Sequence, residues 1–317
     1  MSAPHNAERD RACMDAALAL GRRGLGQTWP NPAVGALVVR ETTDGAVIVG
    51  RGWTQPGGRP HAETEALRRA GAAARGATLY VTLEPCAHQG RTPPCVDAIV
   101  AAGIARVVSS MDDPNPLVAG QGHARLRAAG ISVDLGIAAE AARRDHAGHI
   151  RRIRDGRPHV LLKLAVSADG KAGFAGRKPA PITGEAARRR VHMLRATHDA
   201  VLTGIGTVLA DDPLLTCRLP GMEPHSPVRV VLDTKLRLPL ASKLVATTRQ
   251  APLWVITGAA PGGDKERELH ERGAVVLRVP AGDDGLDLTA ALRALADQGI
   301  TRVMAEAGPI LAAALLR

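Results

Sequence analysis

Aromatic residues are scarce in this chain, and long hydrophobic runs are absent. Phe, Tyr and Trp together make up 2% of its 317 residues. Proteins that bind single-stranded nucleic acid usually stack bases on aromatic side chains beside a basic groove. The scarcity therefore argues against that class, although the net charge is +10. No apolar run is long enough to span a bilayer and no charged-then-apolar leader follows Met1, so we expect a cytoplasmic protein that does not enter a membrane.

Cysteine is also rare, with four residues in the whole chain, so a disulfide framework is not expected. Cysteines in a cytosolic chain are most often buried apolar fillers, so a cysteine taken alone is weak evidence for a metal site. The length is sufficient for two domains, each with its own core. The arginines are scattered through both halves, so most of the positive charge is interpreted as solvated helix faces.

The stretch between His61 and Cys95 differs from this background. It contains His-Ala-Glu at 61–63, Leu-Glu-Pro-Cys at 83–86 and Pro-Pro-Cys at 93–95. One histidine and two cysteines are the ligand set of a zinc deaminase, whose fourth zinc position stays open for water. Zinc lowers the pKa of that water toward about 7 and so supplies hydroxide at neutral pH. Glu63 follows the histidine by two residues, as does the general acid/base of these enzymes.

The local pattern supports this geometry. Pro60 ends a loop, and the apolar residues after it have helical spacing, which places His61 and Glu63 in the first turn of a helix. The apolar run 77–83 reads as a buried strand that delivers Cys86, and a second helical run begins at Cys95. Two helix N-termini would then face the metal and favour thiolate over thiol. Taken alone, a His-x-Glu at a helix start is usually only a surface cap.

The spacing of the two cysteines indicates which group of zinc deaminases the sequence resembles. Nucleic-acid deaminases usually have Cys-x-x-Cys, whereas eight residues, 87–94, intervene here. With Asn-Pro-Ala-Val-Gly at 31–35 and Met-Asp-Asp-Pro-Asn-Pro at 111–116, residues 14–145 closely resemble the bacterial bifunctional riboflavin-biosynthesis deaminase/reductases. The resemblance implies a cytidine-deaminase-like α/β/α domain. It also makes Asn31 a substrate contact, and Arg91 and Thr92 candidate contacts to a ribose phosphate.

The second half alternates strands with helices, which predicts an α/β domain on a mostly parallel sheet. Gly-Ile-Gly at 204–206 is not a full dinucleotide fingerprint, because Leu209 replaces the third glycine. Gly308 lies between a strand and a helix, where backbone N–H groups could hold a cofactor phosphate.

Three segments of this half, 163–170, 203–213 and 306–314, resemble the reductase half of the same family. The resemblance implies a dihydrofolate-reductase-like fold that uses NADPH. The implied pocket for the ribosyl phosphate is lined by Arg195, Leu215, Arg218 and Glu306. The implied NADPH contacts are Ala165, Thr207, Asp211, Thr234, Gly308, Pro309, Ile310, Leu311, Ala312, Ala313 and Ala314.

The chain departs from the family pattern in three places. Some members have a histidine at the position of Thr54, and many have a tryptophan at the position of Pro181. Members also continue past the Gly-Pro helix with further strands, whereas this sequence ends at Arg317. We therefore expect a C-terminally shortened reductase that is weak, inactive or completed by a partner chain. The expected domains are residues 1–147 and 158–317, joined by a polar helical segment at 138–157, and a homo-oligomer is expected.

The resulting hypothesis is a bifunctional enzyme of riboflavin biosynthesis. It would deaminate 2,5-diamino-6-ribosylamino-4(3H)-pyrimidinone 5′-phosphate with zinc, then reduce the ribosyl group to ribityl with NADPH. One alternative is that only the deaminase is active. A second is a nucleic-acid base deaminase, which the long loop between the cysteines and the second domain disfavour. A third is a zinc-stabilised scaffold with His88 as fourth ligand, which would leave Glu63 without a role.

Overall fold

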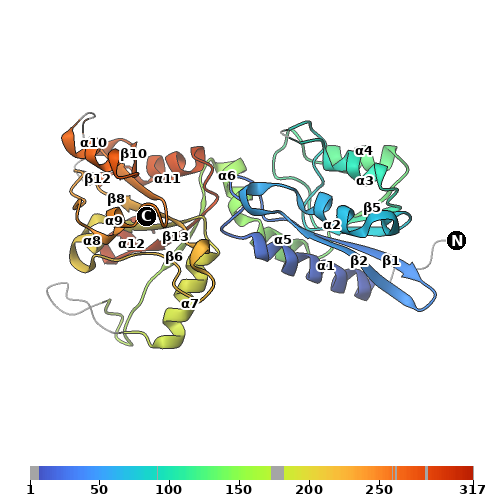
Figure 1. Ribbon diagram of the computed structural model, residues 1–317, viewed down its shortest axis with the longest axis horizontal. Helices are drawn as coiled ribbons and strands as arrows, with labels where there is room; N and C mark the ends of the chain where they lie inside the picture. The colour runs from blue at the N-terminus through green and yellow to red at the C-terminus, as the bar shows by residue number, and fades with distance from the viewer. Residues whose placement is uncertain are drawn as a thin grey trace. The chain divides into compact units, whose positions relative to one another are not determined.

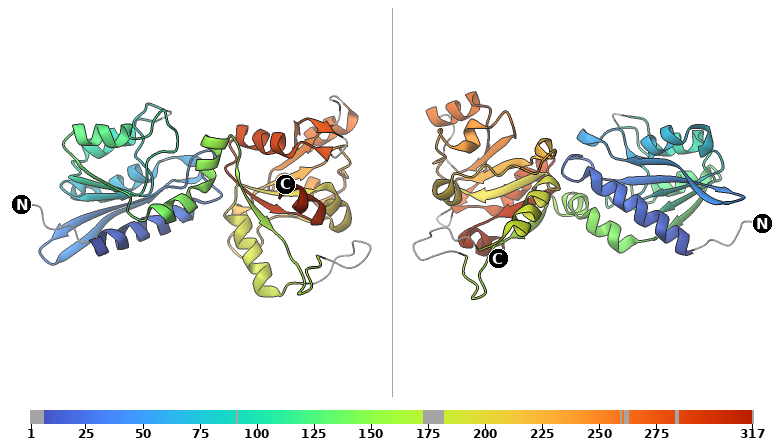
Figure 2. Two further views of the ribbon diagram at one scale, coloured as in Figure 1. Left: turned by 180° about the vertical axis from the view of Figure 1, so that it is seen from behind. Right: turned by 60° about the horizontal axis from the view of Figure 1, so that its bottom comes forward.

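The structure is a computed structural model that describes residues 7–90, 92–172, 182–258, 260, 263–282 and 285–316 (Figures 1 and 2). The chain divides into two compact units, Met1–Asp155 and Gly156–Arg317. The predicted domain limits, 1–147 and 158–317, stay predictions. Among the described helices, none is both long and apolar enough to cross a bilayer.

The first unit is built on a five-stranded sheet with the order β2-β1-β3-β4-β5. β1 pairs antiparallel with both β2 and β3, whereas β3, β4 and β5 run parallel. The helices are distributed over its two faces (Figure 1). The strands are β1 (Gly35–Thr42), β2 (Gly45–Trp53), β3 (Thr78–Val81), β4 (Arg106–Ser109) and β5 (Ser132–Leu135). The helices are α1 (Ala7–Gly21), α2 (Ala62–Ala70), α3 (Cys95–Ala101), α4 (Gln121–Ala128), α5 (Ala139–Asp145) and α6 (Ala147–Asp155).

Alternation along β1 produces two hydrophobic cores, because successive side chains of a strand point to opposite faces. Ala36 and Val38 pack in a cluster with buried residues of α2, α3 and α4. Leu37 and Val39 pack in a second cluster with residues of α1 and α5. Helices therefore cover both faces of the sheet, and the predicted α/β/α order is confirmed.

Two glycines of β2 bring the metal-binding helix against the sheet. A Cβ at Gly52 would lie 2.1 Å from the carbonyl oxygen of Ala62, and one at Gly50 would lie 2.2 Å from that of Ala66. Real Cβ atoms do not approach backbone so closely, so any larger residue would push α2 outward. Glycine at these two positions sets the depth of the helix that carries His61 and Glu63.

A buried charged network ties α1 to the edge of this sheet. The Tyr80 hydroxyl donates to Asp10 at 2.6 Å, and Arg106 donates to both Asp10 oxygens at 3.0 and 2.7 Å. The Nε of Arg106 donates to Asp134 at 2.7 Å. Asp10 is only 3% exposed, so its charge depends on these partners.

Replacing Asp10 by alanine is expected to destabilise the chain by about 3–5 kcal/mol, because it leaves the buried Arg106 guanidinium without its main partner. Asp15 offers a matched control on the same helix, since it pairs with Arg11 across i,i+4 and is half exposed. Asp15→Ala should cost about 0.3–0.5 kcal/mol. Urea unfolding of both variants measures the difference, and equal losses would contradict the network's importance.

The second unit contains a six-stranded, all-parallel sheet with the order β10-β9-β8-β7-β13-β6. A short hairpin, β11 (Ala281–Gly282) with β12 (Gly285–Leu286), lies outside it. The predicted mostly parallel α/β sheet is therefore confirmed. Its strands are β6 (His159–Lys163), β7 (Ala200–Gly204), β8 (Val228–Leu232), β9 (Leu253–Thr257), β10 (Val275–Arg278) and β13 (Arg302–Glu306).

Residues of α7 to α10 pack with the central strands in one hydrophobic cluster that includes Val201, Val231 and Val255. α11 buries four further apolar residues, among them Leu292 and Leu295. The helices are α7 (Glu185–Ala196), α8 (Ile205–Asp211), α9 (Lys243–Ala246), α10 (Asp264–Glu271), α11 (Leu288–Asp297) and α12 (Pro309–Leu315).

Several elements differ from the sequence expectation, and α9, β11 and β12 are among those that were not predicted. The segment 138–157 forms two helices, α5 and α6, separated at His146, whose side chain is buried and bonds Thr82 Oγ1 at 3.1 Å. The strand β5 was not predicted, because it buries little: none of its four residues is fully buried. The helix α8 was also not predicted, since glycine precedes and interrupts its first turn.

A buried histidine makes the second unit sensitive to acid. His198 is 2% exposed, and its Nδ1 lies 2.6 Å from the carbonyl oxygen of Leu194, so Nδ1 carries the proton of the neutral ring. Its Nε2 is buried and has no hydrogen-bond partner within the described part of the chain. Burial, with the nearby charges of Arg302 and His159, lowers the pKa of His198 to about 4.

The sign of the pH effect follows from proton binding. An unfolded histidine titrates at about pH 6.5, whereas folded His198 titrates at about pH 4. Between these two values the histidine is protonated in the unfolded chain and neutral in the folded chain. Stability is therefore expected to fall as the pH drops through this window, by at most about 1.4 kcal/mol per pH unit. A His198→Gln variant should show a shallower slope in urea unfolding between pH 7 and pH 5, and an unchanged slope would contradict the assignment.

Candidate active sites

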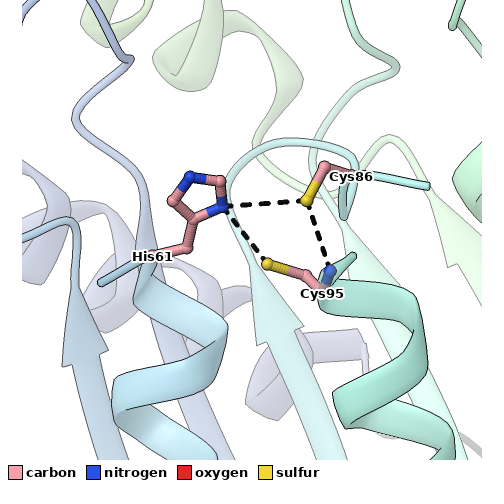
Figure 3. Close-up of side chains that lie close together, drawn as sticks. All are labelled: His61, Cys86 and Cys95. Atoms are coloured by element: carbon pink, nitrogen blue, oxygen red, sulfur yellow. Dashed lines mark hydrogen bonds between the residues drawn. The ribbon is translucent and has the colours of Figure 1, made fainter. Parts of the chain in front are cut away.

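The first candidate site lies where three elements of the first unit begin or end. His61 is the N-cap residue of α2, and Cys95 is the first residue of α3. Cys86 lies in the loop that follows β3. The three side chains converge, with both sulfur atoms facing the imidazole (Figure 3). The structure thus brings together the three ligands that the sequence predicts.

The distances suit a tetrahedral zinc ion. His61 Nδ1 lies 3.3 Å from Cys95 Sγ and 3.7 Å from Cys86 Sγ, and all three donor atoms lie within 4.8 Å of one another. Zn–S bonds of about 2.3 Å and Zn–N bonds of about 2.0–2.1 Å place neighbouring tetrahedral donors roughly 3.5–3.8 Å apart. The donor set also has the chemistry that zinc prefers, so the residues fit the ion.

The two thiols have unequal proton affinities. The Cys95 thiol interacts with the Cys86 sulfur, and this hydrogen bond, with those from His61 and the Cys95 backbone N–H, lowers the pKa of Cys86 to about 4. The same hydrogen bond and burial raise the pKa of Cys95. The Cys86 thiolate in turn raises the pKa of His61. Cys86 is therefore the more readily deprotonated of the two thiols, and the thiolate is the form that binds a metal cation.

Glu63 occupies the first turn of α2 and is 4% exposed. Burial, followed by the negative charge of Cys86, raises the pKa of its carboxyl group above the usual range. A carboxyl group whose pKa is raised holds a proton more readily and can both accept and return one. Its position and its pKa therefore suit proton transfer.

No fourth His, Cys, Asp or Glu side chain joins this cluster in the ranges that the structure describes. His88, the alternative fourth ligand, is exposed in the loop between the cysteines. A zinc ion bound by three side chains keeps a position for water, as in catalytic sites. The scaffold alternative lacks its ligand among these residues.

Two residues near the site were singled out from the sequence. Asn31 is a predicted substrate contact, and Thr54 is a departure from the family pattern. Asn31 donates its side-chain amide to the carbonyl of Gly58 at 2.8 Å, which fixes it beside the loop that leads to His61. Thr54, where some family members have histidine, is 2% exposed, and its hydroxyl accepts from the backbone N–H of Val34. That hydroxyl is thus used in the fold. Arg91 and Pro181 lie outside the described residues.

The sequence did not single out Glu84, which the structure places in a buried position two residues before Cys86. Its carboxylate accepts hydrogen bonds from four backbone N–H groups, those of Asp113, Gly120, Gly122 and His123, at 2.9, 2.9, 2.8 and 3.4 Å. The only sequence signal was its position in the Leu-Glu-Pro-Cys motif.

The second candidate site lies at one edge of the parallel sheet in the second unit. The predicted cofactor contacts follow the carboxyl ends of β6, β7, β8 and β13, and in a parallel sheet these ends share an edge. Ala165 follows β6, Thr207 and Asp211 lie on α8 after β7, and Thr234 follows β8. After β13, Gly308 is the N-cap of α12, and Pro309, Ile310, Leu311, Ala312, Ala313 and Ala314 lie within that helix.

An ion pair joins α7 to β13 at this edge. Arg195 donates from Nε and Nη2 to the two carboxylate oxygens of Glu306, at 2.5 and 2.9 Å. Its Nη1 donates to the carbonyl of Thr216 at 3.0 Å. Both side chains are largely buried, at 10% and 13% exposure. The Arg195 guanidinium therefore orients Glu306 directly.

Arg218 and Leu215 lie on the segment beyond this ion pair. Leu215 is 3% exposed and has a positive φ of 56°, and Arg218 is exposed. The backbone N–H of Arg218 donates to His192 Nδ1 at 3.2 Å, a contact that the sequence did not suggest. Burial and the charges of Arg195 and Arg218 lower the pKa of His192, so its ring is neutral at neutral pH.

Each of the two units matches a known family model. Residues 158–317 match the family model of the RibD C-terminal domain. Residues 7–111 match the model of the cytidine and deoxycytidylate deaminase zinc-binding region. The chain is 43% identical to riboflavin biosynthesis protein RibD of Escherichia coli, over 98% of this chain and 84% of that protein. It is 44% identical to RibD of Aquifex aeolicus, over 95% and 82% of the two chains.

Solved structures agree with the sequence relatives. The chain is similar to Acinetobacter baumannii RibD, with a TM-score of 0.86 and 40% identity over 98% of this chain and 84% of that one. A deaminase/reductase from Thermotoga maritima gives a TM-score of 0.82 with 35% identity, over 96% and 82% of the two chains. Because these matches span both units, the chain belongs to the RibD family of bifunctional riboflavin-biosynthesis deaminase/reductases.

Proposed function

We propose that this chain deaminates 2,5-diamino-6-ribosylamino-4(3H)-pyrimidinone 5′-phosphate in its first unit and reduces the ribosyl group of the product in its second. The observation that carries the proposal is the convergence of His61, Cys86 and Cys95 at zinc-binding distances, with Glu63 buried in the same helix turn. The substrate class comes from a relative, the Thermotoga maritima diaminohydroxyphosphoribosylaminopyrimidine deaminase and 5-amino-6-(5-phosphoribosylamino)uracil reductase.

In the deaminase, His61, Cys86 and Cys95 would hold the zinc ion. When bound, the ion would supply a water molecule of lowered pKa and positive charge beside the reacting carbon. Glu63 takes a proton from the attacking water and delivers it to the departing amino group, which leaves as ammonia. Asn31, held by Gly58, contacts the pyrimidine ring. Thr92, whose hydroxyl accepts from Arg59 at 2.6 Å, would contact the ribose phosphate.

In the reductase, NADPH would supply a hydride to C1′ of the opened ribose. The residues that follow β6, β7, β8 and β13, at the carboxyl ends of these strands, would hold this cofactor. Glu306 orients the sugar hydroxyls, and Arg195 fixes the carboxylate in place. Arg218 binds the phosphate, since it is exposed and Glu306 already engages Arg195. Leu215 lines the same pocket.

The assembly and cellular setting follow from the same proposal. The substrate and product are small phosphorylated pyrimidines, so neither reaction requires nucleic acid or a membrane. We propose a homo-oligomer located in the cytoplasm. Size-exclusion chromatography with light scattering tests the assembly, and a monomeric mass at micromolar concentration would contradict it.

Mass spectrometry of the purified chain with the diaminopyrimidine ribosylamino phosphate, with and without NADPH, tests the function. The expected result is replacement of an amino group by oxygen without NADPH, and addition of two hydrogens when NADPH is present. Deamination alone would limit the activity to the first unit. Without deamination by the zinc-loaded chain, the substrate assignment fails, and deamination of RNA would be examined next.

A further inference from the structure

Glu84 is a buried carboxylate surrounded by backbone donors. In the part of the chain that the structure describes, the basic group paired with it is His123, whose Nδ1 is 4.0 Å away. The Glu84 side chain is 2% exposed. Oε2 accepts from Asp113 and Gly120, both at 2.9 Å, and Oε1 accepts from Gly122 at 2.8 Å and His123 at 3.4 Å. The donors belong to the loop between β4 and α4 and to the first turn of α4. The carboxylate therefore fills an anion-binding concavity formed by the chain's own backbone.

This arrangement does not suit a second metal ion, although Glu84, Asp112 and His123 have ligand atoms within 4.8 Å of one another. Both Glu84 oxygens already accept hydrogen bonds from N–H groups, whose positive ends would repel a cation. His123 Nδ1 is 3.0 Å from Asp112 and 4.0 Å from Glu84, so the histidine pairs with Asp112. The cluster of Glu84, Asp112 and His123 therefore stabilises the loop and the start of α4.

The loop between β4 and α4 also contacts the segment that leads to the zinc ligand Cys86. The backbone N–H of Glu84 donates to the carbonyl of Met111 at 3.0 Å. A Cβ at Gly122 would lie 2.1 Å from the carbonyl oxygen of Pro85, the residue between Glu84 and the ligand Cys86. The side chains of Asp113 and Asn115 form tight turns within the loop, at 2.8 and 3.0 Å. Glu84 thus joins the loop to the segment that presents a zinc ligand.

We propose that Glu84 is a positioning residue for deamination. Its carboxylate holds the loop 112–122, with Asp113 and Asn115, at a fixed distance from Cys86. The proposal places this loop, whose N–H groups bond a carboxylate two residues before Cys86, at the wall of the pocket for the pyrimidine ribosylamino phosphate. This inference rests on the proposed deaminase function. It goes beyond that function by naming the residue that sets the geometry of the substrate pocket without touching the reacting atoms.

A Glu84→Gln substitution isolates this role because it keeps the shape and removes the charge. An amide NH₂ cannot accept a hydrogen bond, so the N–H groups at one of the two oxygen positions would face a donor. Buried donors without acceptors are costly, and the loop should move away from Cys86. The zinc ligands themselves are unchanged by the substitution.

Steady-state kinetics of the zinc-loaded full chain test the proposal. Glu84→Gln is expected to lower kcat/KM for deamination by roughly 10- to 100-fold, mostly through KM, as a small misplacement of substrate does. Zinc content should stay at one ion per chain, and the NADPH-dependent reduction of deaminated substrate should be unchanged. Glu65→Gln is the matched control, because Glu65 is a buried carboxylate of α2 whose ion pairs among the described residues are with Arg68 and Arg69.

Amide hydrogen exchange gives a second measurement that does not depend on the variant. In the unmodified chain, the N–H groups of Asp113, Gly120 and Gly122 are expected to exchange slowly although they lie in or beside a loop. Fast exchange at these amides, or a Glu84→Gln variant with unchanged KM, overturns the role of Glu84. Absence of deamination in the unmodified chain instead overturns the proposed function itself, so the two failures are distinguishable.

Discussion

A Glu63→Gln variant is expected to lose deamination by at least about 10²- to 10⁴-fold in kcat while still binding zinc. Glutamine keeps the shape of the side chain but cannot accept and return a proton. The three ligands His61, Cys86 and Cys95 are untouched by the change, so metal affinity should be preserved. The loss is therefore expected in kcat, measured by mass spectrometry or by ammonia release at saturating substrate.

Two internal controls accompany this measurement. NADPH-dependent reduction by the same chain should be unaffected, because the second unit has its own core and its own site. Zinc content, measured by atomic emission, should match that of the unmodified chain. Full deaminase activity in Glu63→Gln would remove Glu63 from the mechanism, and loss of zinc would mean that the carboxylate supports the metal site instead.

Removal of Glu306 is expected to damage both the stability and the chemistry of the second unit. In Glu306→Ala, the buried Arg195 guanidinium would lose both of its carboxylate hydrogen bonds. Breaking a buried ion pair in this way typically costs about 3–5 kcal/mol. Reduction should fall by roughly 10²-fold or more, since a carboxylate that orients the sugar is lost. Deamination should be unchanged.

A double variant separates stability from chemistry. Replacing Arg195 by methionine and Glu306 by leucine removes both charges together, and such exchanges are often neutral or stabilising. We therefore expect Arg195→Met/Glu306→Leu to regain most of the stability while reduction stays lost. Recovery of reduction along with stability would show that the ion pair serves only the fold, and the predicted substrate contact of Glu306 would then be wrong.

The zinc site could be predicted because its three ligands lie in short sequence motifs that occur in a characteristic order. His61, Cys86 and Cys95 are each placed by the start of a helix or the end of a strand, and such ends can be located from hydrophobic periodicity. The supporting residues could not be predicted in the same way. Glu84 is recognised only by the backbone N–H groups that surround it, and these come from residues 113–123, which the chain brings back through β4.

In the fold, too, some elements could be predicted from the sequence and others could not. The strands β1, β8, β9 and β13 were predicted because they are strongly apolar, and most of their residues are buried. β5 is only half buried at an edge of its sheet, so its sequence carries little signal. The pairing of Arg195 with Glu306 was also not evident. Both were assigned to one pocket through family resemblance, but sequence alone does not show that one residue holds the other.

The strand order of the second sheet determines when its site can form during synthesis. β13 lies between β7 and β6, and β6 pairs with no other strand among the described residues. β6 leaves the ribosome early, whereas β13 begins only at Arg302. The nascent chain must therefore carry β6 without a partner until translation has reached Glu306. The first unit has all five strands of its sheet before residue 136, so deaminase folding can be complete while the reductase is still being made.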